Sequence, residues 1–246
     1  MRFRGANPVY SRIGEMYGES DYSATYGGVT KKTALLLAII ASVAFYFGSS
    51  LNFTTNLNSA FITIIIAPII AIISIFLAHR NLELAWMFSL IYATMEGVFL
   101  GFISALFTYF FGSDIVMMAL LATFGVLAGM LFLYSTGLIR VGNFFRRAMF
   151  SMLLGLLFAG IILIMMSLFG GLNSTFGYNF YFGIVVLSVI VSSLYLLVDF
   201  DNITNLVEAG ADKKYEWMLS LGLVVTIVWL YIELLRFIAI ISSSRK

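Results

Sequence analysis

The chain has no cysteine, one histidine and few charged residues, and each of these shortages excludes a class of function. Without cysteine it can form neither a disulfide nor a thiolate metal site. With His79 as its only histidine, it cannot build a histidine-rich transition-metal centre. A net charge of +2, with no basic stripe outside short loops, indicates that nucleic acid is not a partner. The P-loop and H-E-x-x-H motifs are also missing, so we expect neither enzymatic activity nor a cofactor.

Long apolar stretches dominate the 246 residues. Charged residues make up 11% of the chain and hydrophobic residues 61%, and the mean hydropathy is +1.02. So little charge cannot cover a water-soluble domain, whereas lipid accommodates an apolar exterior. About 20 apolar residues cross a bilayer as a helix. The sequence therefore predicts an all-α membrane protein of seven transmembrane helices, a domain of residues 33–246, with spans at about 33–53, 57–78, 84–111, 115–138, 149–169, 181–200 and 217–241.

Basic residues predict how this bundle is oriented. They occur in the polar tail of residues 1–32 and in the loops after the second, fourth and sixth spans, namely Arg80, Arg140, Arg146, Arg147, Lys213 and Lys214. The alternate loops contain no lysine or arginine. Because positively charged loops stay in the cytoplasm, we expect the N-terminus and the tail there and the C-terminus outside.

Small residues and one proline suggest how the helices pack. Gly97 and Gly101, like Gly125 and Gly129, have the small-xxx-small spacing that allows membrane helices to approach closely. Pro68 removes a backbone hydrogen bond in the middle of the second span and predicts a kink there.

Three acids lie inside, or at the end of, predicted spans: Glu96, Asp199 and Glu233. A charged carboxylate in the bilayer centre costs about 2.5–3.5 kcal/mol on insertion scales, so such residues usually face a polar interior and have a function there. Each also has a structural interpretation. Glu96 can be neutral and hydrogen-bonded to a neighbouring helix, Asp199 can sit at an interfacial helix end, and Glu233 can pair with Arg236 three residues later.

Other polar residues extend this set. Asp201 is roughly 200° around the helix from Asp199, so the two side chains cannot serve one site from the same helix face. For Asp201 we favour the interpretation that it faces water. Thr226, Glu233 and Arg236 form a polar stripe on the last span. Carboxylate oxygens bind hard cations such as calcium, and carboxylates close together in a low dielectric share a proton. The acids can therefore bind a cation, sense protons, or do both, with Asp199 and Glu233 as candidate metal ligands.

Several segments of this chain resemble the Bax inhibitor family, also called transmembrane Bax inhibitor motif proteins. Residues 193–203, SLYLLVDFDNI, resemble the aspartate-bearing sixth helix of the family. Residues 78–92 and the following EGVFLG at 96–101 resemble its second and third helices, and LLRFIAIIS at 234–242 resembles its last. The opening NPVY at 7–10 and the stretch from 216–217 to WLYIE at 229–233 are closer to a bacterial YccA-like branch, which implies a bacterial plasma membrane.

The resemblance implies a seven-helix bundle with the last helix at its centre, and a pH-sensitive calcium leak. The family's leak is governed by two aspartates, on helices six and seven, and by an arginine near the end of helix two. Asp199 matches the first aspartate, and Arg80 matches the arginine, although His79 is an alternative at that position. The second aspartate is absent: alignment through Arg236 puts Thr226 in its place, and Glu233 and Glu96 are the nearest substitutes.

Two functions follow as hypotheses. The first is a cation leak channel, for calcium, gated by protonation of the inner carboxylates: Asp199 is the gate and proton sensor, Arg80 or His79 its competing cation, and Glu96, Glu233 and Asp201 are candidate cation ligands supported by Thr226 and Arg236. Pairing of Asp199 with Arg80 would close the path. The alternative is a membrane-embedded regulator of a membrane protease or stress complex, with the tail and residues 201–216 as its contacts to a protein partner. A proton-coupled transporter has less support, because no internal repeat is visible.

Overall fold

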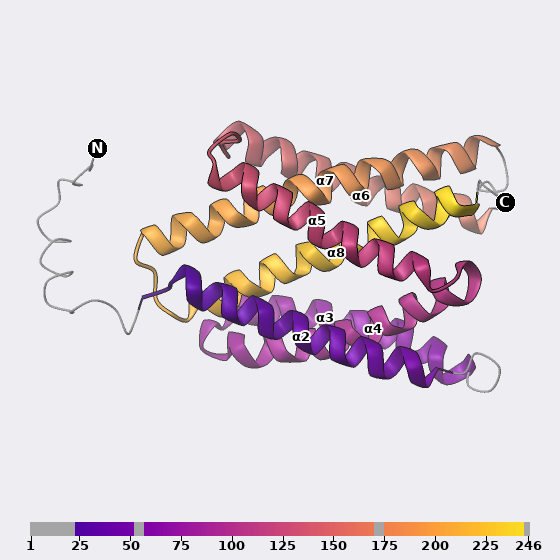
Figure 1. Cartoon of the computed structure of the whole chain (residues 1–246), viewed down its shortest axis with the longest axis horizontal. Helices are drawn as coiled ribbons and strands as arrows, with labels where there is room; N and C mark the ends of the chain where they lie inside the picture. The colour runs from indigo at the N-terminus through magenta and orange to yellow at the C-terminus, as the bar shows by residue number, and fades with distance from the viewer. Residues whose placement is uncertain (1–22, 52–56, 170–174, 244–246) are drawn as a thin grey trace, which may run out of the picture.

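The computed structural model describes residues 23–51, 57–169 and 175–243, and these residues form long helices joined by short connections. Most of the predicted tail, residues 1–22, lies outside this part. The helices are α2 (Tyr26–Ser50), α3 (Leu57–Arg80), α4 (Ala85–Phe111) after a short 3-10 turn (Leu82–Leu84), α5 (Asp114–Ser135), α6 (Asn143–Leu168), α7 (Thr175–Glu208) and α8 (Tyr215–Ser243). They run roughly along the long axis of the molecule, so that the start of α2 and the end of α8 lie at opposite ends (Figure 1).

The outer surface of the bundle is apolar, as expected for contact with lipid. Six helices are long and apolar enough to cross a bilayer, and α3 adds a shorter apolar stretch, Ile65–Arg80, in its described side chains. Large apolar side chains are exposed on several of these helices, including Phe45, Phe76, Leu121 and Phe158. The chain is therefore an integral membrane protein, because lipid stabilises such a surface and water does not.

Several helices extend beyond their predicted spans: α6 begins at Asn143 and not at 149, and α7 begins at Thr175 and not at 181. Helix α2 begins at Tyr26 and not at 33, so residues 26–32, expected in the polar tail, belong to α2. Thr25 caps this helix, and its hydroxyl accepts the Gly28 N–H at 2.9 Å. At its other end, α7 continues past residue 200 to Glu208, where Gly210 turns the chain with φ +69° and stops the helix. Hydropathy marks the membrane-buried part of a helix, not its capped ends.

Helix α8 contributes the largest share of the buried residues. It packs against α2, α4, α5 and α7, and Figure 1 shows it running between α2 and α7. Its side chains belong to two apolar clusters, one shared with α2, α3, α4 and α5 and the other shared with α2 and α7. Helix α6, in contrast, packs mainly against α7. Four polar residues of α8 are therefore held inside the protein: Glu216, Ser220, Thr226 and Glu233.

Glycines bring α2 and α4 close together. A Cβ atom on Gly101 would lie 2.7 Å from the Ala44 carbonyl oxygen, and one on Gly97 would lie 2.8 Å from the Val43 Cβ. The predicted close approach at Gly97 and Gly101 is thus confirmed. At Gly125 and Gly129 on α5 a Cβ would meet nothing within 4 Å, so these glycines do not form a packing seam within the described chain. The proline in α3, Pro68, does not interrupt that helix.

A polar clasp ties the start of α2 to the start of α8. The buried carboxylate of Glu216 accepts hydrogen bonds from the Thr25 N–H at 2.9 Å and from the Thr25 hydroxyl at 3.0 Å, and it pairs with Lys32. Gly28 is required beside it, because a Cβ there would overlap the carboxylate. The clasp fixes the first turns of α8, which form part of the site described next.

Candidate functional site

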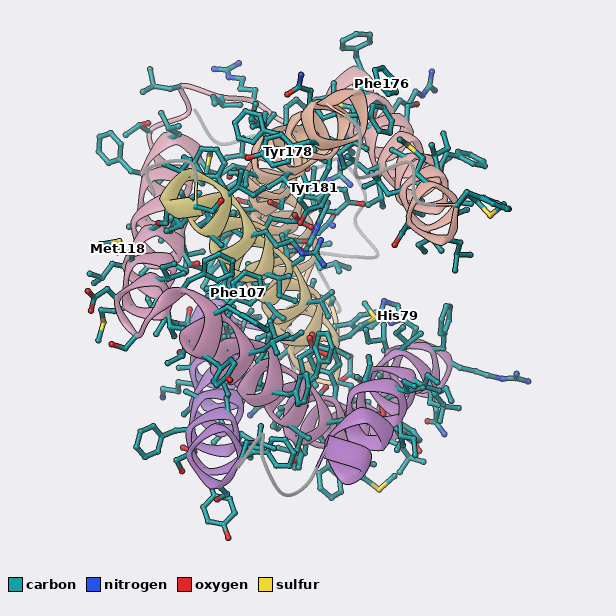
Figure 2. The ribbon with its side chains drawn as sticks, turned by 90° about the vertical axis from the view of Figure 1, so that its right-hand side faces the viewer. His79, Phe107, Met118, Phe176, Tyr178 and Tyr181 are labelled. Carbon is teal, nitrogen blue, oxygen red and sulfur yellow. The ribbon has the colours of Figure 1, made fainter. Side chains whose placement is uncertain are left out.

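A polar pocket lies at the end of the bundle where α3 and α7 end and α6 and α8 begin. Its volume is about 350 Å³. Side chains from four helices line it: His79, Arg146, Asp199, Asn202, Asn205, Leu206, Met218, Leu219 and Gly222. Figure 2 shows His79 at the end of α3, beside α8. The α3 and α6 walls of the pocket belong to different packing pairs, because α3 packs mainly on α4 and α6 packs mainly on α7.

Asp199 is the acid that this pocket reaches. Its Oδ2 atom is buried and has no hydrogen-bond partner within the described part of the chain. The same carboxyl is in hydrogen-bonding contact with the Thr226 hydroxyl of α8. The Gly222 carbonyl oxygen, 3.3 Å from the Thr226 hydroxyl, is a second acceptor for the one hydroxyl proton. The structure therefore brings together the two residues that the sequence places at the family's aspartate positions.

The neighbouring acid, Asp201, has a different environment. Its carboxylate pairs with Arg146 of α6, accepts a hydrogen bond from the Asn205 amide at 3.0 Å, and lies 3.4 Å from the Tyr134 hydroxyl of α5. Arg146 also donates to Asn202 at 2.7 Å. Asp201 is thus a link between three helices, with its charge already balanced. This pairing argues against its predicted role as a cation ligand and agrees with its expected separation from Asp199.

The two basic residues at the end of α3 differ in position. His79 lines the pocket, and its Nδ1 lies 2.9 Å from the Ile75 carbonyl oxygen. Arg80 is exposed and does not line the pocket. The predicted ion pair between Arg80 and Asp199 is therefore not formed in this structure, because the next position on the helix turns Arg80 away from the site. His79, which is also exposed, is the one of the two that lines the pocket with Asp199.

Glu233 lies deeper in the membrane domain, on the same stripe of α8 as Thr226. It is 6% exposed. Its Oε1 atom accepts hydrogen bonds from the Trp229 indole N–H and from Arg236, both at 3.3 Å, while Oε2 is buried and has no partner in the described chain. The predicted ion pair between Glu233 and Arg236 is confirmed. Seven residues separate Thr226 from Glu233, about 10 Å along the helix.

Glu96 is buried on α4, one turn from Tyr92, and does not line the pocket. The predicted acids thus occupy three separate places. Among the described residues, His, Asp and Glu form no group of three or more that could hold a metal ion. Asp199 and Glu233 therefore do not share one metal site here, although each keeps a buried oxygen free.

Three residues of the site escaped sequence reasoning. Arg146 was noted only as a loop charge, and nothing in the sequence indicates that it reaches Asp201 on a helix 55 residues away. Asn202 and Asn205 line the pocket, and their spacing from Asp199, three and six residues along one helix, is the signal that could have placed them near it.

Comparison with known proteins identifies the family. The family model described as Bax inhibitor 1 like matches residues 7–243, nearly the whole chain. No curated protein matches the chain. The match includes every helix described above and the pocket with Asp199, so the chain belongs to the Bax inhibitor 1 like family.

Proposed function

We propose that this protein is a pH-sensitive cation leak channel, with calcium as its main cargo, and that Asp199 is its gate. The observation that carries the proposal is a single one. A membrane-embedded carboxyl lies at a polar pocket between four helices and has one buried oxygen without a partner. Such a group is costly in a membrane unless it binds something there.

The donor set of the pocket suits a weakly held hard cation. Asp199 supplies a carboxylate, Thr226 contacts that carboxyl with its hydroxyl oxygen, and Asn205 brings an amide oxygen to the pocket, whereas the Asn202 oxygen is bonded to Arg146. Calcium prefers such oxygen ligands, and its affinity rises with the number of carboxylates around it. A single free carboxylate beside the positive charge of Arg146 gives weak and transient binding, as conduction requires. Protonation of Asp199 removes the negative charge that attracts the cation and so changes the flux.

The proposal includes a topology. We infer seven crossings, with α3 as the seventh, and α8 as the central helix around which the others pack. The pocket end contains the basic loops and lies in the cytoplasm, which puts the C-terminus outside. A closer relationship to bacterial YccA-like proteins stays a prediction from residues 7–10 and 216–233, as does a bacterial plasma membrane.

The test is calcium flux into liposomes containing the purified protein, measured with an enclosed calcium dye at pH 6 and pH 8. The wild type should give fluxes that differ severalfold between the two pH values. Asp199→Asn cannot ionise, so its fluxes should agree within about twofold. Glu208→Gln is the matched control, because Glu208 is an exposed acid near the same end of α7. It should keep the wild-type pH dependence.

Two outcomes would contradict the proposal. A folded Asp199→Asn protein with the pH dependence of the wild type would move the sensor to another acid. No calcium flux at either pH in the wild type would favour the alternative function, a membrane-embedded regulator of a protease or stress complex. A protein crosslinked to the chain in native membranes would then be the expected finding.

A further inference from the structure

Two polar stripes face each other along the whole length of the α7–α8 interface. On α7 the stripe consists of Tyr181, Ser188, Ser192, Tyr195 and Asp199, which are spaced three, four or seven residues apart and so share one helix face. On α8 it consists of Thr226, Trp229, Glu233 and Arg236. We call the two stripes together the α7–α8 seam. Apolar residues at a helix interface in a membrane cost less free energy than polar ones. We therefore expect this polar arrangement to have a function.

Contacts at three depths join the two stripes. At the pocket end, Asp199 contacts the Thr226 hydroxyl. One turn deeper, the Tyr195 and Trp229 rings meet edge to face, with their centroids 6.3 Å apart. Deeper still, Tyr181 lies within electrostatic range of both Arg236 and Glu233. Figure 2 shows Tyr181 on the side of α7 toward α8. Residues of the two stripes therefore meet or interact from the pocket to the far half of the membrane domain.

The Tyr195–Trp229 pair divides this seam into two compartments. Tyr195 is one turn from Asp199, and Trp229 is one turn from Glu233, to which its indole donates. Both rings also pack against the apolar cluster around Met149, Val191 and Val198. The aromatic pair therefore lies between Asp199 and Glu233 along the seam.

The position of Arg236 indicates from which side of the membrane Glu233 is accessible. Its side chain is 45% exposed, although it lies on a membrane helix. An arginine in that position must extend its guanidinium to water or to lipid headgroups. Only seven residues, about 10 Å of helix, separate it from the end of α8. The polar environment at the C-terminal end of α8 therefore extends to Arg236, which is paired with Glu233.

The ligand of Glu233 cannot be a divalent cation, because Arg236 already places a positive charge 3.3 Å from its Oε1. The charged or titratable groups that act on Glu233 from the described helices are Arg236 on α8 and Tyr181 on α7. Its second oxygen, Oε2, is buried and accepts no hydrogen bond there. A proton needs no further ligands, and it neutralises a buried oxygen that otherwise has no partner, which is the effect that favours it against the opposing charge of Arg236.

We propose that Glu233 is a proton-binding site that exchanges with the C-terminal side of the membrane, and that the Tyr195–Trp229 pair separates it from the Asp199 pocket. The proton binds to Oε2 while Trp229 and Arg236 hold Oε1. The molecule then has two carboxyls that sample the pH of opposite compartments. This site goes beyond the leak proposed above and does not require that the protein conduct calcium.

The test is infrared difference spectroscopy of the full-length protein in a surface-tethered bilayer. The C=O stretching band of a protonated carboxyl group lies in a spectral region where ionised carboxylates do not absorb. A tag at the N-terminus binds the surface and leaves the C-terminal side facing the flowing buffer, and a tag at the C-terminus reverses this orientation. With the N-terminal tag, a pH step in the buffer should change one carboxyl band, and Glu233→Gln should abolish that change. With the C-terminal tag, the band that responds should be the one removed by Asp199→Asn.

Trp229→Phe tests the assignment of the band to Glu233 and keeps a ring at the same place. It should shift the frequency of the Glu233 band, because the indole hydrogen bond to Oε1 is lost, and leave the Asp199 band unchanged. Spectra identical to the wild type in folded Glu233→Gln would overturn the proton site. The same band responding equally from both sides would overturn the separation. Neither result depends on calcium flux, so failure of this proposal and failure of the leak are distinguishable.

Discussion

Buried acids in this protein are stabilised to very different extents, and the difference separates structural residues from functional ones. Glu216 receives two hydrogen bonds and a lysine, so its charge is fully balanced. Asp201 is balanced by Arg146 and Asn205. Asp199 and Glu233 each keep one buried oxygen with no partner in the described chain. A fully bonded carboxylate holds helices together, whereas an unsatisfied one costs stability and is retained for binding.

Glu216→Gln should destabilise the protein by about 2–4 kcal/mol, because it leaves the largely buried Lys32 without a counter-charge and weakens the bonds from Thr25. The measurement is the thermal unfolding midpoint in detergent, which should fall clearly. Glu83→Gln is the control. Its pair with Lys214 is exposed on both sides, with 76% and 50% of the two side chains accessible, so its loss should change stability by less than about 1 kcal/mol. Equal midpoints for the two variants would refute a structural role for the clasp.

Sequence reasoning located the acids but not all of their partners. The Glu233–Arg236 pair was predictable because residues three apart on a helix are neighbours. The meeting of Asp199 with Thr226 followed from the family resemblance. The pairs of Arg146 with Asp201 and of Lys32 with Glu216 join residues far apart in the chain, and only the packing of α6 and α2 brings them together. Arg80 was misjudged because one helical position, about 100°, decides whether His79 or Arg80 faces the pocket.

At the scale of the elements, the positions of the helices were predictable and their packing was not. Hydropathy located each helix because lipid imposes a minimum apolar length. It could not distinguish the two glycine pairs, since both have the same spacing. The structure distinguishes them: Gly97 and Gly101 lie against α2, whereas Gly125 and Gly129 have open space beyond them. Close approach depends on what a helix faces, which spacing alone does not reveal.

Gly101→Ala should destabilise the bundle by about 1–3 kcal/mol, because its Cβ would lie 2.7 Å from a backbone oxygen of α2 and force the two helices apart. Gly129→Ala is the matched control on α5. Its Cβ meets nothing within 4 Å, and alanine is the better helix former, so stability should be unchanged or rise by up to about 1 kcal/mol. Thermal unfolding of both variants under one condition provides the comparison. A loss in Gly129→Ala as large as in Gly101→Ala would show that the α2–α4 seam is not special.

At the scale of the whole molecule, polarity is distributed unevenly between the two ends of the bundle. The basic side chains of the described connections and helix ends, including Arg80, Arg140, Arg147, Lys213 and Lys214, gather at the end that contains the pocket. The opposite end has no lysine or arginine in the connection between α4 and α5. This asymmetry supports the proposed orientation, in which the Asp199 pocket faces the cytoplasm and Glu233 is reached from outside.

The absence of cysteine makes the orientation directly measurable, because any single introduced cysteine is the only thiol in the chain. Ser50→Cys and Ser113→Cys lie at exposed positions at one end, and Asn81→Cys and Leu138→Cys lie at exposed positions at the other. In intact cells, a membrane-impermeant maleimide should label the first two. The other two should react only after the membrane is permeabilised.

The pair Ser50 and Asn81 decides the crossing of α3, because these residues flank that helix and its connection to α2. If positions 50 and 81 are labelled from opposite sides of the membrane, α3 crosses it. This crossing adds to the six described helices that are long and apolar enough to span a bilayer. Labelling of both from the same side would leave six crossings and put His79 on the same side as the end of α2. The pocket between α3, α6, α7 and α8 could not then form as described, and the Asp199 gate would lose its structural basis.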